Sequence, residues 1–580
     1  MLALPLAFTA LLAAFGALPA VRENPRFLWA FWGATAILLA WTGALWIRAA
    51  RGGRTLSTRF VLRRPHWLQP LVQLSIYVYW GWYWRQVYDS AWLIAAQLVF
   101  AYAFDMLLAW SRRDEYELGF GPFPIILSMN LFLWFKPDWF YLQFVMVAVG
   151  FAAKELIRWK KDGRLAHIFN PSSFPLAIAS VFLIWTGTVD HTWGREIAVS
   201  IGDPLHIFEF LFLISIPGQI LFGVATLTMP AVVTTFLLSA AYSGVTGTYY
   251  FFGPIPTAAF LGMLLLFTDP STAPKTELGR IFYGVLYGVS VFILYGLLDL
   301  AGQPTFYDKL LFVPFLNLGV RAIDRLALSP LLSRFDTAAL GRSLSGRKRN
   351  LAFTCIWAIA FAGVFAAHGV GDSHPANRLP FWQHACDEKL RNGCRNLETM
   401  ETTYCQRGSG WACNEFGIRA VQDASHSLEN RSAVAKIVFD RSCTLGTPAG
   451  CANAGISPAD AGAGAEAFRH QPPSPEDYEI VLETKGLPRD RTVLQLWQWA
   501  CEQGWQDGCE KAASVSGPGG LPGGDRLRSA HQYESECAGG SLAGCRNLGL
   551  MYRRGDGVRR DDRRAMACDL GVTEGCVGPL

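Results

Sequence analysis

The apolar residues of this chain are concentrated in its first 371 positions, where they recur in long runs separated by short polar stretches. A bilayer core is crossed by roughly 20 consecutive apolar residues in helical form, and a helix satisfies its own backbone polar groups. The pattern therefore predicts an all-α fold that begins with a polytopic transmembrane helix bundle. We expect spans at 3–20, 27–47, 67–84, 91–110, 121–136, 138–157, 172–188, 207–227, 231–249, 252–268, 281–300, 308–321 and 351–370. Several Pro and Gly residues leave the count between 206 and 268 open.

The first apolar run has two interpretations. Met1–Ala20 ends in Ala17-Leu18-Pro19-Ala20, which places small residues after an apolar stretch, as a secretory signal does. The run lacks a basic beginning, however, and a second apolar run follows almost at once. We favour a retained helix and keep a cleaved signal as the alternative.

The distribution of charge predicts the topology. A formal net charge of +5 is small for 580 residues and gives no indication of nucleic-acid binding. Lys and Arg accumulate in cytoplasmic loops, and here they cluster at Arg48–Arg64, Arg158–Lys161 and Arg321–Arg349. With all three clusters inside, the last span runs outward and the region from Asp372 onward is extracytoplasmic.

Twelve of the 13 cysteines lie beyond the last span and fall into six pairs with one separation. The pairs are Cys386/Cys394, Cys405/Cys413, Cys443/Cys451, Cys501/Cys509, Cys537/Cys545 and Cys568/Cys576. Zinc sites usually use Cys-x2-Cys spacing, and few histidines accompany these cysteines. Disulfides persist outside the cytosol, where the charge pattern independently places this region. We therefore predict six disulfides and no metal site.

The cysteine pairs belong to a repeated unit. The Cys-x7-Cys spacing and the run Leu548-Gly549-x-x-Tyr552-x-x-Gly555-x-Gly557-Val558 resemble cysteine-rich Sel-one-like repeats, which are relatives of the tetratricopeptide repeat. The resemblance implies a disulfide-stapled α-solenoid over 372–580, with a concave surface for a protein or peptide partner. No nucleophile–base pair stands out there, so we favour a scaffold over an enzyme in this domain.

Two short motifs interrupt the apolar part of the chain. Asn170-Pro171-Ser172-Ser173-Phe174-Pro175 and Asp269-Pro270-Ser271-Thr272-Ala273-Pro274 share one pattern and lie 99 residues apart. Asn or Asp followed by Pro is typical of a helix N-terminus, so both motifs have an interpretation as ordinary helix starts. Their repetition equally favours an internally repeated membrane fold with a ligand site at helix N-termini. Whether the repeats are inverted or parallel stays open.

These motifs carry a family resemblance. His167-Ile168-Phe169-Asn170-Pro171, Ile216-Pro217-Gly218, Phe267–Gly284 and Pro314-Phe315-Leu316-Asn317 look like the RnfD/NqrB family, a membrane component shared by Rnf electron-transport complexes and sodium-pumping NADH:quinone reductases. The RnfD/NqrB-like domain would cover 61–330, between N-terminal helices at 1–60 and a basic cytoplasmic linker with the last span at 331–371.

The resemblance implies an electron-transfer subunit that holds flavin mononucleotide, riboflavin or both, moves Na⁺ or H⁺, and assembles with other subunits of a redox complex. The candidate flavin-binding residues are Asn170, Pro171, Thr246, Thr268, Asp269, Pro270, Thr272, Gly279 and Arg280. Together with the disulfides, it implies a multi-pass protein of a bacterial inner membrane, surrounded by lipid, with its C-terminal domain in the periplasm.

The chain departs from this family at the flavin attachment site. The family attaches flavin to a threonine in Asp-x-x-Ser/Thr-Gly-Ala-Thr, but the loop Thr188–His206 contains no such string. Ser243-Gly244-Val245-Thr246 is the nearest match, and in a membrane such a string is more often a helix-packing surface. The alternative function is therefore a non-redox anchor or transporter that displays the repeats. We expect no self-contained active site, only a role as a subunit of an oxidoreductase or translocase complex.

Polar side chains within the spans are further candidates, because such residues are costly in lipid. They are Asp105, Lys154, Glu155 and Glu209. Asp105 is equally well explained as a functional carboxylate or as the partner of a cation on a neighbouring helix. The Trp and Tyr residues of 78–91 are expected to form an interfacial belt, with stacking on a flavin ring as the alternative.

Overall fold

The computed structural model describes residues 3–161, 164–251, 255–332, 335, 344–372, 374–422, 428–456, 467–484, 491–516, 530–531, 533–535, 537–539, 542–555, 558–569 and 573–577. The regular secondary structure of the described chain is almost all helix, which confirms the predicted all-α class. Its strands form two small ribbons. β1 (Ser57–Phe60) pairs in parallel with β2 (Glu115–Leu118), and β3 (Arg158–Lys161) pairs antiparallel with β4 (Arg164–His167).

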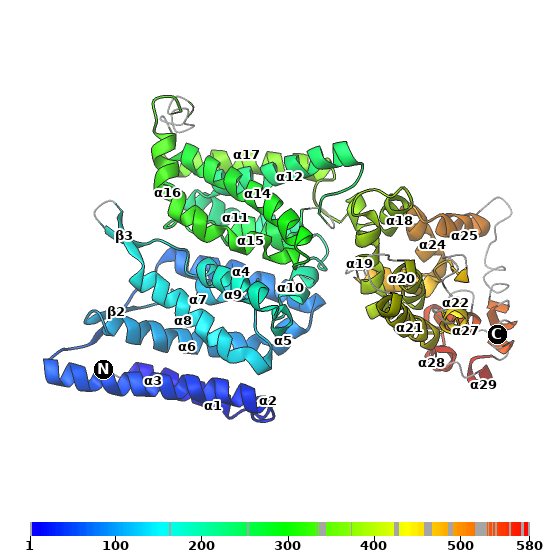
Figure 1. The fold of residues 1–580 in the computed structure, drawn as a ribbon, viewed down its shortest axis with the longest axis horizontal. Coiled ribbons are helices and arrows are strands. Elements are labelled where there is room, and N and C mark those ends of the chain that lie inside the picture. Colours follow the sequence, from blue (N-terminus) through cyan, green and yellow to red (C-terminus); the bar gives the residue numbers. More distant parts are fainter. Residues whose placement is uncertain are drawn as a thin grey trace. The chain divides into compact units, whose positions relative to one another are not determined.

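The chain divides into two compact units, each with its own core (Figure 1). The apolar unit comprises Met1–Tyr242 and Gly253–Ser373, and the cysteine unit comprises Ser243–Phe252 and His374–Leu580. The boundary near residue 373 lies two positions from the predicted one at 371. The grouping of 243–252 with the cysteine unit has no counterpart in the sequence pattern. Tyr249 explains it, because its ring packs 4.5 Å from His374 and 4.8 Å from Phe381.

Six helical segments of the apolar unit are long and apolar enough to cross a membrane. They contain α3 (Pro25–Gly52), α5 (Gln86–Asp89) with α6 (Ala91–Trp110), α8 (Phe140–Leu156), α12 (Ala225–Thr246), α14 (Glu277–Leu300) and α17 (Gly346–Ala366). Large apolar side chains stand exposed on this unit, among them Trp29, Ile37, Trp46, Trp82, Trp185 and Ile359. Side chains of this kind are stable against lipid rather than water, so this unit has the character of a multi-pass membrane domain.

The remaining helices of this unit are shorter, except α4 (Arg64–Tyr83), which has 20 residues but is not among the six apolar segments. The others are α1 (Ala3–Gly16), α2 (Pro19–Arg22), α7 (Pro122–Asn130), α9 (Ser173–Thr186), α10 (Gly194–Ser200), α11 (Ile207–Phe222), α13 (Thr257–Leu265), α15 (Asp308–Leu311) and α16 (Val313–Ala327). The spans predicted at 121–136 and 252–268 are therefore wrong in length. Each contains a helix of nine residues, which is about 14 Å long and about half a bilayer core. The span predicted at 308–321 is broken between α15 and α16, just before Pro314.

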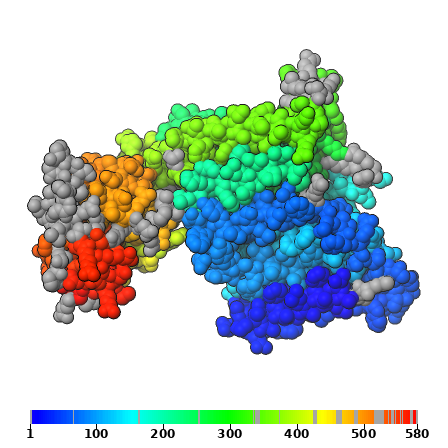
Figure 2. Space-filling view, turned by 180° about the vertical axis from the view of Figure 1, so that it is seen from behind, coloured from blue at the N-terminus to red at the C-terminus, as the bar shows by residue number. Residues whose placement is uncertain are grey.

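The helices of the apolar unit form a layered bundle. α1 and α3 lie together at one edge and pack on α6 and α8, while α17 lies along α11 (Figures 1 and 2). Small residues allow close approach between α12 and α14. A Cβ added at Gly284 would lie 2.3 Å from the carbonyl oxygen of Leu227, and one at Gly288 would lie 2.5 Å from that of Ala231. Glycine is therefore required for this helix crossing.

The cysteine unit consists of short helices joined by disulfides. Its helices are α18 (Leu379–Asp387), α19 (Gly393–Gln406), α20 (Gly410–Gln422), α21 (Leu428–Thr444), α22 (Pro448–Ala454), α23 (Pro475–Thr484), α24 (Val493–Glu502), α25 (Gln506–Ser516), α27 (Leu542–Arg554), α28 (Asp562–Asp569) and α29 (Thr573–Cys576). The first four disulfides each tie one helix to the next across a short turn, and in all six the Cα atoms are 4.3–4.6 Å apart.

The structure confirms all six predicted disulfides. They are Cys386–Cys394, Cys405–Cys413, Cys443–Cys451, Cys501–Cys509, Cys537–Cys545 and Cys568–Cys576. The six disulfides have the same spacing in the sequence, but they differ in burial. The second, fifth and sixth pairs are part of the core of this unit, whereas Cys394 and Cys451 are exposed and Cys509 is half-buried. The bonds at Cys451 and Cys509 therefore tie helix ends together near the surface rather than filling the core.

A glycine precedes the second cysteine in five of the six pairs, and the structure gives the reason. A Cβ at Gly393 would lie 2.5 Å from the carbonyl oxygen of Ala385, on the preceding helix. A Cβ at Gly450 would lie 2.1 Å from Ser442 Oγ, and one at Gly508 would lie 2.6 Å from the Cβ of Ala500. At these three positions the two helix ends lie so close that only glycine fits, whereas Ala412 is accommodated before Cys413 in the second pair.

Candidate functional site

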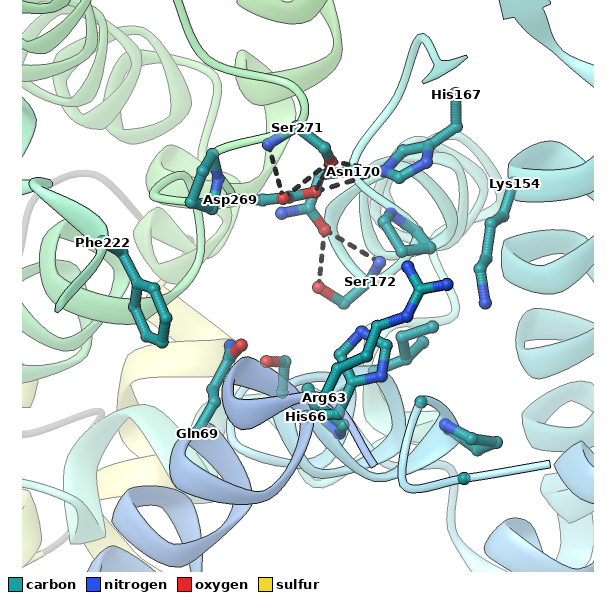
Figure 3. Close-up of a pocket in the computed structure, with 18 of the residues that line it drawn as sticks. Arg63, His66, Gln69, Lys154, His167, Asn170, Ser172, Phe222, Asp269 and Ser271 are labelled. Atoms are coloured by element: carbon teal, nitrogen blue, oxygen red, sulfur yellow. Dashed lines mark hydrogen bonds and ion pairs between the residues drawn. The ribbon is translucent and has the colours of Figure 1, made fainter. Parts of the chain in front are cut away.

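The apolar unit contains a partly open cavity of about 860 Å³ (Figure 3). This volume lies within the range of about 300–1,000 Å³ that is usual for small-molecule sites. Its wall comes from the β1–α4 segment, α6, the β2–α7 segment, the end of α8, β4, α11, α13 and both repeated motifs. Five predicted flavin-binding residues line it, namely Asn170, Pro171, Thr268, Asp269 and Pro270, and Gly218 of the mid-chain signature joins them.

The first motif begins a helix, as predicted. Asn170 Oδ1 accepts hydrogen bonds from the backbone N–H groups of Ser172 at 2.9 Å and Ser173 at 3.2 Å, at the start of α9. These N–H groups have no partner within the helix, so the amide oxygen caps it. The amide nitrogen of Asn170 donates to the carbonyl oxygen of Leu266 at 2.9 Å. Asn170 therefore caps α9 and also holds the segment that leads into the second motif.

The second motif does not begin a helix, and that interpretation is wrong. α14 begins at Glu277, seven residues after Pro270, and Thr276 caps it by accepting from the N–H of Gly279 at 3.1 Å. Asp269 instead forms a turn, in which Oδ1 accepts from the backbone N–H of Ser271 at 2.9 Å. The local sequence is compatible with both conformations, and long-range contacts of Asp269 favour the turn.

His167 supplies these contacts from β4. Its Nε2 lies 2.7 Å from Ser271 Oγ and 3.3 Å from Asp269 Oδ2. Burial alone would raise the pKa of Asp269, but the hydrogen bond and charge of His167 and the bonds from Ser271 outweigh it and lower the pKa to about 2. Asp269 is thus an anion that orders the loop, and Figure 3 shows the three side chains together at the cavity wall.

Asn317 of α16 joins the two motifs. Its Oδ1 accepts from the backbone N–H of Asn170 at 3.1 Å, and its Nδ2 donates to the carbonyl oxygen of Thr272 at 3.3 Å and to Tyr283 Oη at 2.8 Å. The Asn317 side chain is fully buried. One amide therefore holds both motif loops in register at the cavity.

The other predicted flavin residues are not among the described residues that line the cavity. Thr272 belongs to the second motif, but its side chain is buried. Gly279 lies in the first turn of α14, and Arg280 donates to the carbonyl oxygens of Pro274 at 3.0 Å and Gly223 at 2.9 Å. These three residues shape the loop. Thr246 lies in the segment that groups with the cysteine unit.

Charged side chains predicted as candidates also reach the cavity. Asp105, Lys154 and Glu155 line it, whereas Glu209 bonds His206 Nδ1 at 3.2 Å and is not part of the described lining. Asp105 accepts from Tyr116 Oη at 3.1 Å, and no described cation forms an ion pair with it. Of the two interpretations of Asp105, the ion pair therefore has no cation among the described residues.

No motif or pattern in the sequence singled out the other residues that line the cavity. They include His66, Gln69, Tyr116, Ser128 and Phe222, and apolar side chains such as Val72, Ile125, Leu264 and Leu265. His66 follows Arg63 and Arg64 in a basic run that indicates topology, and only the fold turns it toward a cavity. None of the Trp and Tyr residues of 78–91 is part of the described lining. The lining combines apolar surfaces with several hydrogen-bond donors, which suits a flat organic ligand with polar edges.

No protein-family model, no curated protein and no solved structure matches this chain.

Proposed function

We propose that this protein is a membrane-embedded electron-transfer subunit resembling RnfD/NqrB, and that it binds a flavin non-covalently in the cavity. The observation that carries the proposal is the convergence of three separate signature segments on one cavity. Asn170-Pro171, Gly218 and Thr268-Asp269-Pro270 are far apart in the sequence, and residues of all three line the same wall.

The lining fits a flavin. A flavin has a flat, largely apolar ring system with hydrogen-bonding edges, and it supplies the electron-transfer chemistry when bound. Phe222, Leu264 and Leu265 offer apolar surface for such a ring, while Gln69 and Ser128 offer polar groups for its edges. The protein would bind and orient the ring, exclude water from it, and leave donor and acceptor to other subunits of a redox complex.

The positions of two threonines support non-covalent rather than covalent binding of the flavin. Thr246, the nearest match to an attachment site, lies outside the described cavity lining. Thr268 lines the cavity, but its hydroxyl donates to the carbonyl oxygen of Leu264 at 3.0 Å and closes a helical turn. A flavin in this cavity would therefore be held by shape and hydrogen bonds.

The cysteine unit has a different proposed role. We assign it to Sel-one-like repeats that form an α-solenoid in the periplasm, with the apolar unit in the bacterial inner membrane. Helices paired across disulfides support this assignment, because such bonds persist in oxidising compartments and stacked helix pairs create concave binding surfaces. Its partner would be a protein or peptide.

An absorbance and fluorescence spectrum of the detergent-purified protein tests the redox proposal. We expect a flavin spectrum, and we expect acid precipitation to release the flavin into the supernatant. Flavin that stays in the pellet would contradict non-covalent binding. Protein without flavin, made in a flavin-replete host, would overturn the redox proposal.

That last result would favour the second candidate, a non-redox anchor or transporter. The observation in its favour is the region between α9 and α11. Where the family carries its attachment site, this chain folds into a short 3₁₀ turn (Val189–His191) and α10. A membrane cavity with charged walls is also suited to passing a polar solute.

A further inference from the structure

One wall of the cavity carries a strong excess of positive charge. Glu155, in the last turn of α8, is buried. It forms ion pairs with three arginines that come from two segments of the chain. Arg113 Nη1 lies 2.7 Å and Arg112 Nε 3.6 Å from Glu155 Oε1, and Arg158 Nη2 pairs with Oε2. A single carboxylate balances one of these three cations, so this cluster has a net charge of +2.

Lys154 adds a further charge to this wall. No described carboxylate lies within ion-pair distance of its ammonium, which is 5.4 Å from the ring centre of Phe151. Among the lining residues, Arg113, Arg158 and Lys154 against Glu155 give +3 and −1, hence a local charge of +2. Arg113, Lys154 and Arg158 all line the cavity, and in Figure 3 the Lys154 side chain extends along its edge.

His66 faces the same charges from the start of α4. Burial lowers the pKa of His66, and the positive charges of Lys154 and Arg63 lower it further. The carboxylates of Asp269 and Glu117 act in the opposite direction, so the lowered pKa reflects mainly burial and only secondly the positive charges nearby. Arg63 pairs with Glu117, and Arg59 pairs with Glu117 at 3.0 Å and with Glu115 at 3.3 Å, so two arginines balance the two carboxylates of β2.

The two remaining acids of the lining, Asp105 and Asp269, are held by hydrogen bonds, and neither forms an ion pair with a described arginine or lysine. Asp105 accepts from Tyr116, and Asp269 is held by His167 and Ser271. They lie on other elements of the wall, α6 and the second motif loop, so the positive excess is confined to the wall formed by α8, β3 and the residues after α6. A doubly charged anion with several acceptor oxygens would balance this charge, and arginine and lysine bind such anions well.

We propose that Lys154, Arg113 and Arg158 form a binding site for a phosphate monoester group carried by the cavity ligand. This inference rests on the proposed function and sharpens it, because it selects flavin mononucleotide over riboflavin. The phosphate would lie against the cationic wall, and the ring would extend toward Phe222 and Leu264.

Flavin titrations of the full chain test this site. The protein is reconstituted in nanodiscs of zwitterionic lipid, freed of flavin, and titrated with flavin mononucleotide or riboflavin while flavin fluorescence is recorded. We expect the mononucleotide to bind about 10- to 100-fold more tightly, as a charged hydrogen bond of about 1.5–3 kcal/mol implies. Inorganic phosphate should weaken binding of the mononucleotide but not of riboflavin.

Matched variants test whether the charge of Lys154 causes the preference for the mononucleotide. Lys154→Gln should reduce the affinity for flavin mononucleotide toward that for riboflavin and leave riboflavin unchanged. Lys154→Arg keeps the charge and should retain the preference, which separates loss of charge from misfolding. Lys136→Gln is the control, since Lys136 pairs with Glu196 at 3.6 Å and is not part of the described lining.

The failures are distinguishable. Equal binding of both flavins, unchanged by Lys154→Gln, would overturn the phosphate site and leave the flavin proposal intact. Binding of neither flavin would overturn the proposed function itself. Nanodiscs with anionic lipid test a second source of phosphate. If anionic lipid removes the preference for the mononucleotide while inorganic phosphate does not compete, the wall binds a lipid headgroup, and the inference is overturned.

Discussion

Asn317 Oδ1 accepts a hydrogen bond from the backbone N–H of Asn170 at 3.1 Å, across 147 positions of the sequence. The same side chain donates to Thr272 and Tyr283, so one buried amide connects both repeated motifs. The geometry of the cavity wall therefore depends on a residue that is not part of the described lining.

Replacing Asn317 tests this dependence. Asn317→Leu removes a donor and an acceptor while leaving the N–H of Asn170, the carbonyl of Thr272 and the hydroxyl of Tyr283 buried. At about 1 kcal/mol for each partner, we expect a loss of about 3 kcal/mol in unfolding free energy. Thermal unfolding in detergent measures it, with Leu318→Ala on the exposed side of the same helix as control. Equal unfolding temperatures for the two variants would show that the amide does not hold the loops.

A buried ion pair in the apolar unit gives a second prediction. Lys309 Nζ lies 3.1 Å from Asp308 Oδ1, and both side chains are almost fully buried. Lys309→Met leaves an uncompensated carboxylate and should cost about 3–5 kcal/mol. Asp308→Asn together with Lys309→Met removes both charges, keeps an acceptor for the N–H of Lys309, and should recover most of the loss. A double variant no more stable than Lys309→Met in thermal unfolding would contradict this account.

The cysteine unit should show a pH-dependent contribution from His470. Its Nδ1 lies 2.6 Å from Glu415 Oε2, and this hydrogen bond raises its pKa above the ordinary value of 6.5. The protonated imidazole thus stabilises the fold below pH 6.5, and this contribution is lost as the pH rises through the raised pKa. Because the His470 side chain is 64% exposed, we expect well under about 1 kcal/mol.

His470→Gln provides the comparison. The wild type should unfold at a higher temperature than the variant at about pH 5, and the difference should close at about pH 8, across the range where histidine titrates. A difference of the same size at both pH values would show that the contribution of His470 does not depend on the protonation of its imidazole.

The disulfides should differ in their resistance to reduction, because thiol exchange requires access to the sulfur. Cys394 and Cys451 are exposed, whereas Cys405 and Cys413 are buried. We expect a mild thiol reductant to open the pairs of Cys394 and Cys451 before Cys405–Cys413. Alkylation followed by peptide mass spectrometry on the full chain measures the order. If the buried pair opened first, exposure of the sulfur would not determine the order of reduction.

The parts of the fold that depend on neighbours in the sequence were predictable. Asn170 caps α9 through N–H groups two and three residues away, so its spacing alone predicts the contact. The cysteine pairs, Cys443–Cys451 and Cys501–Cys509 included, follow from a fixed separation of eight, which spans one turn between two helices. The six long apolar segments of the apolar unit likewise lie at long apolar runs of the sequence.

Features that depend on distant residues were not predictable. Asp269 has the same local pattern as Asn170, yet His167, 102 positions away, holds it in a turn. The helices α7 and α13 are as apolar as spanning helices, but they end after nine residues. The sequence places Arg113 and Arg158 in separate segments, and only the fold brings both to Glu155.

The most direct test of the central claim is the flavin content of a variant whose cavity is filled. Gln69 lines the cavity, and in Figure 3 its side chain points into it. Val78, on the same helix α4, is 64% exposed and is not part of the described lining, so Val78→Trp is the matched control. We predict that purified Gln69→Trp carries no flavin while Val78→Trp carries as much as the wild type. A full complement of flavin in Gln69→Trp would contradict the placement of the flavin in this cavity.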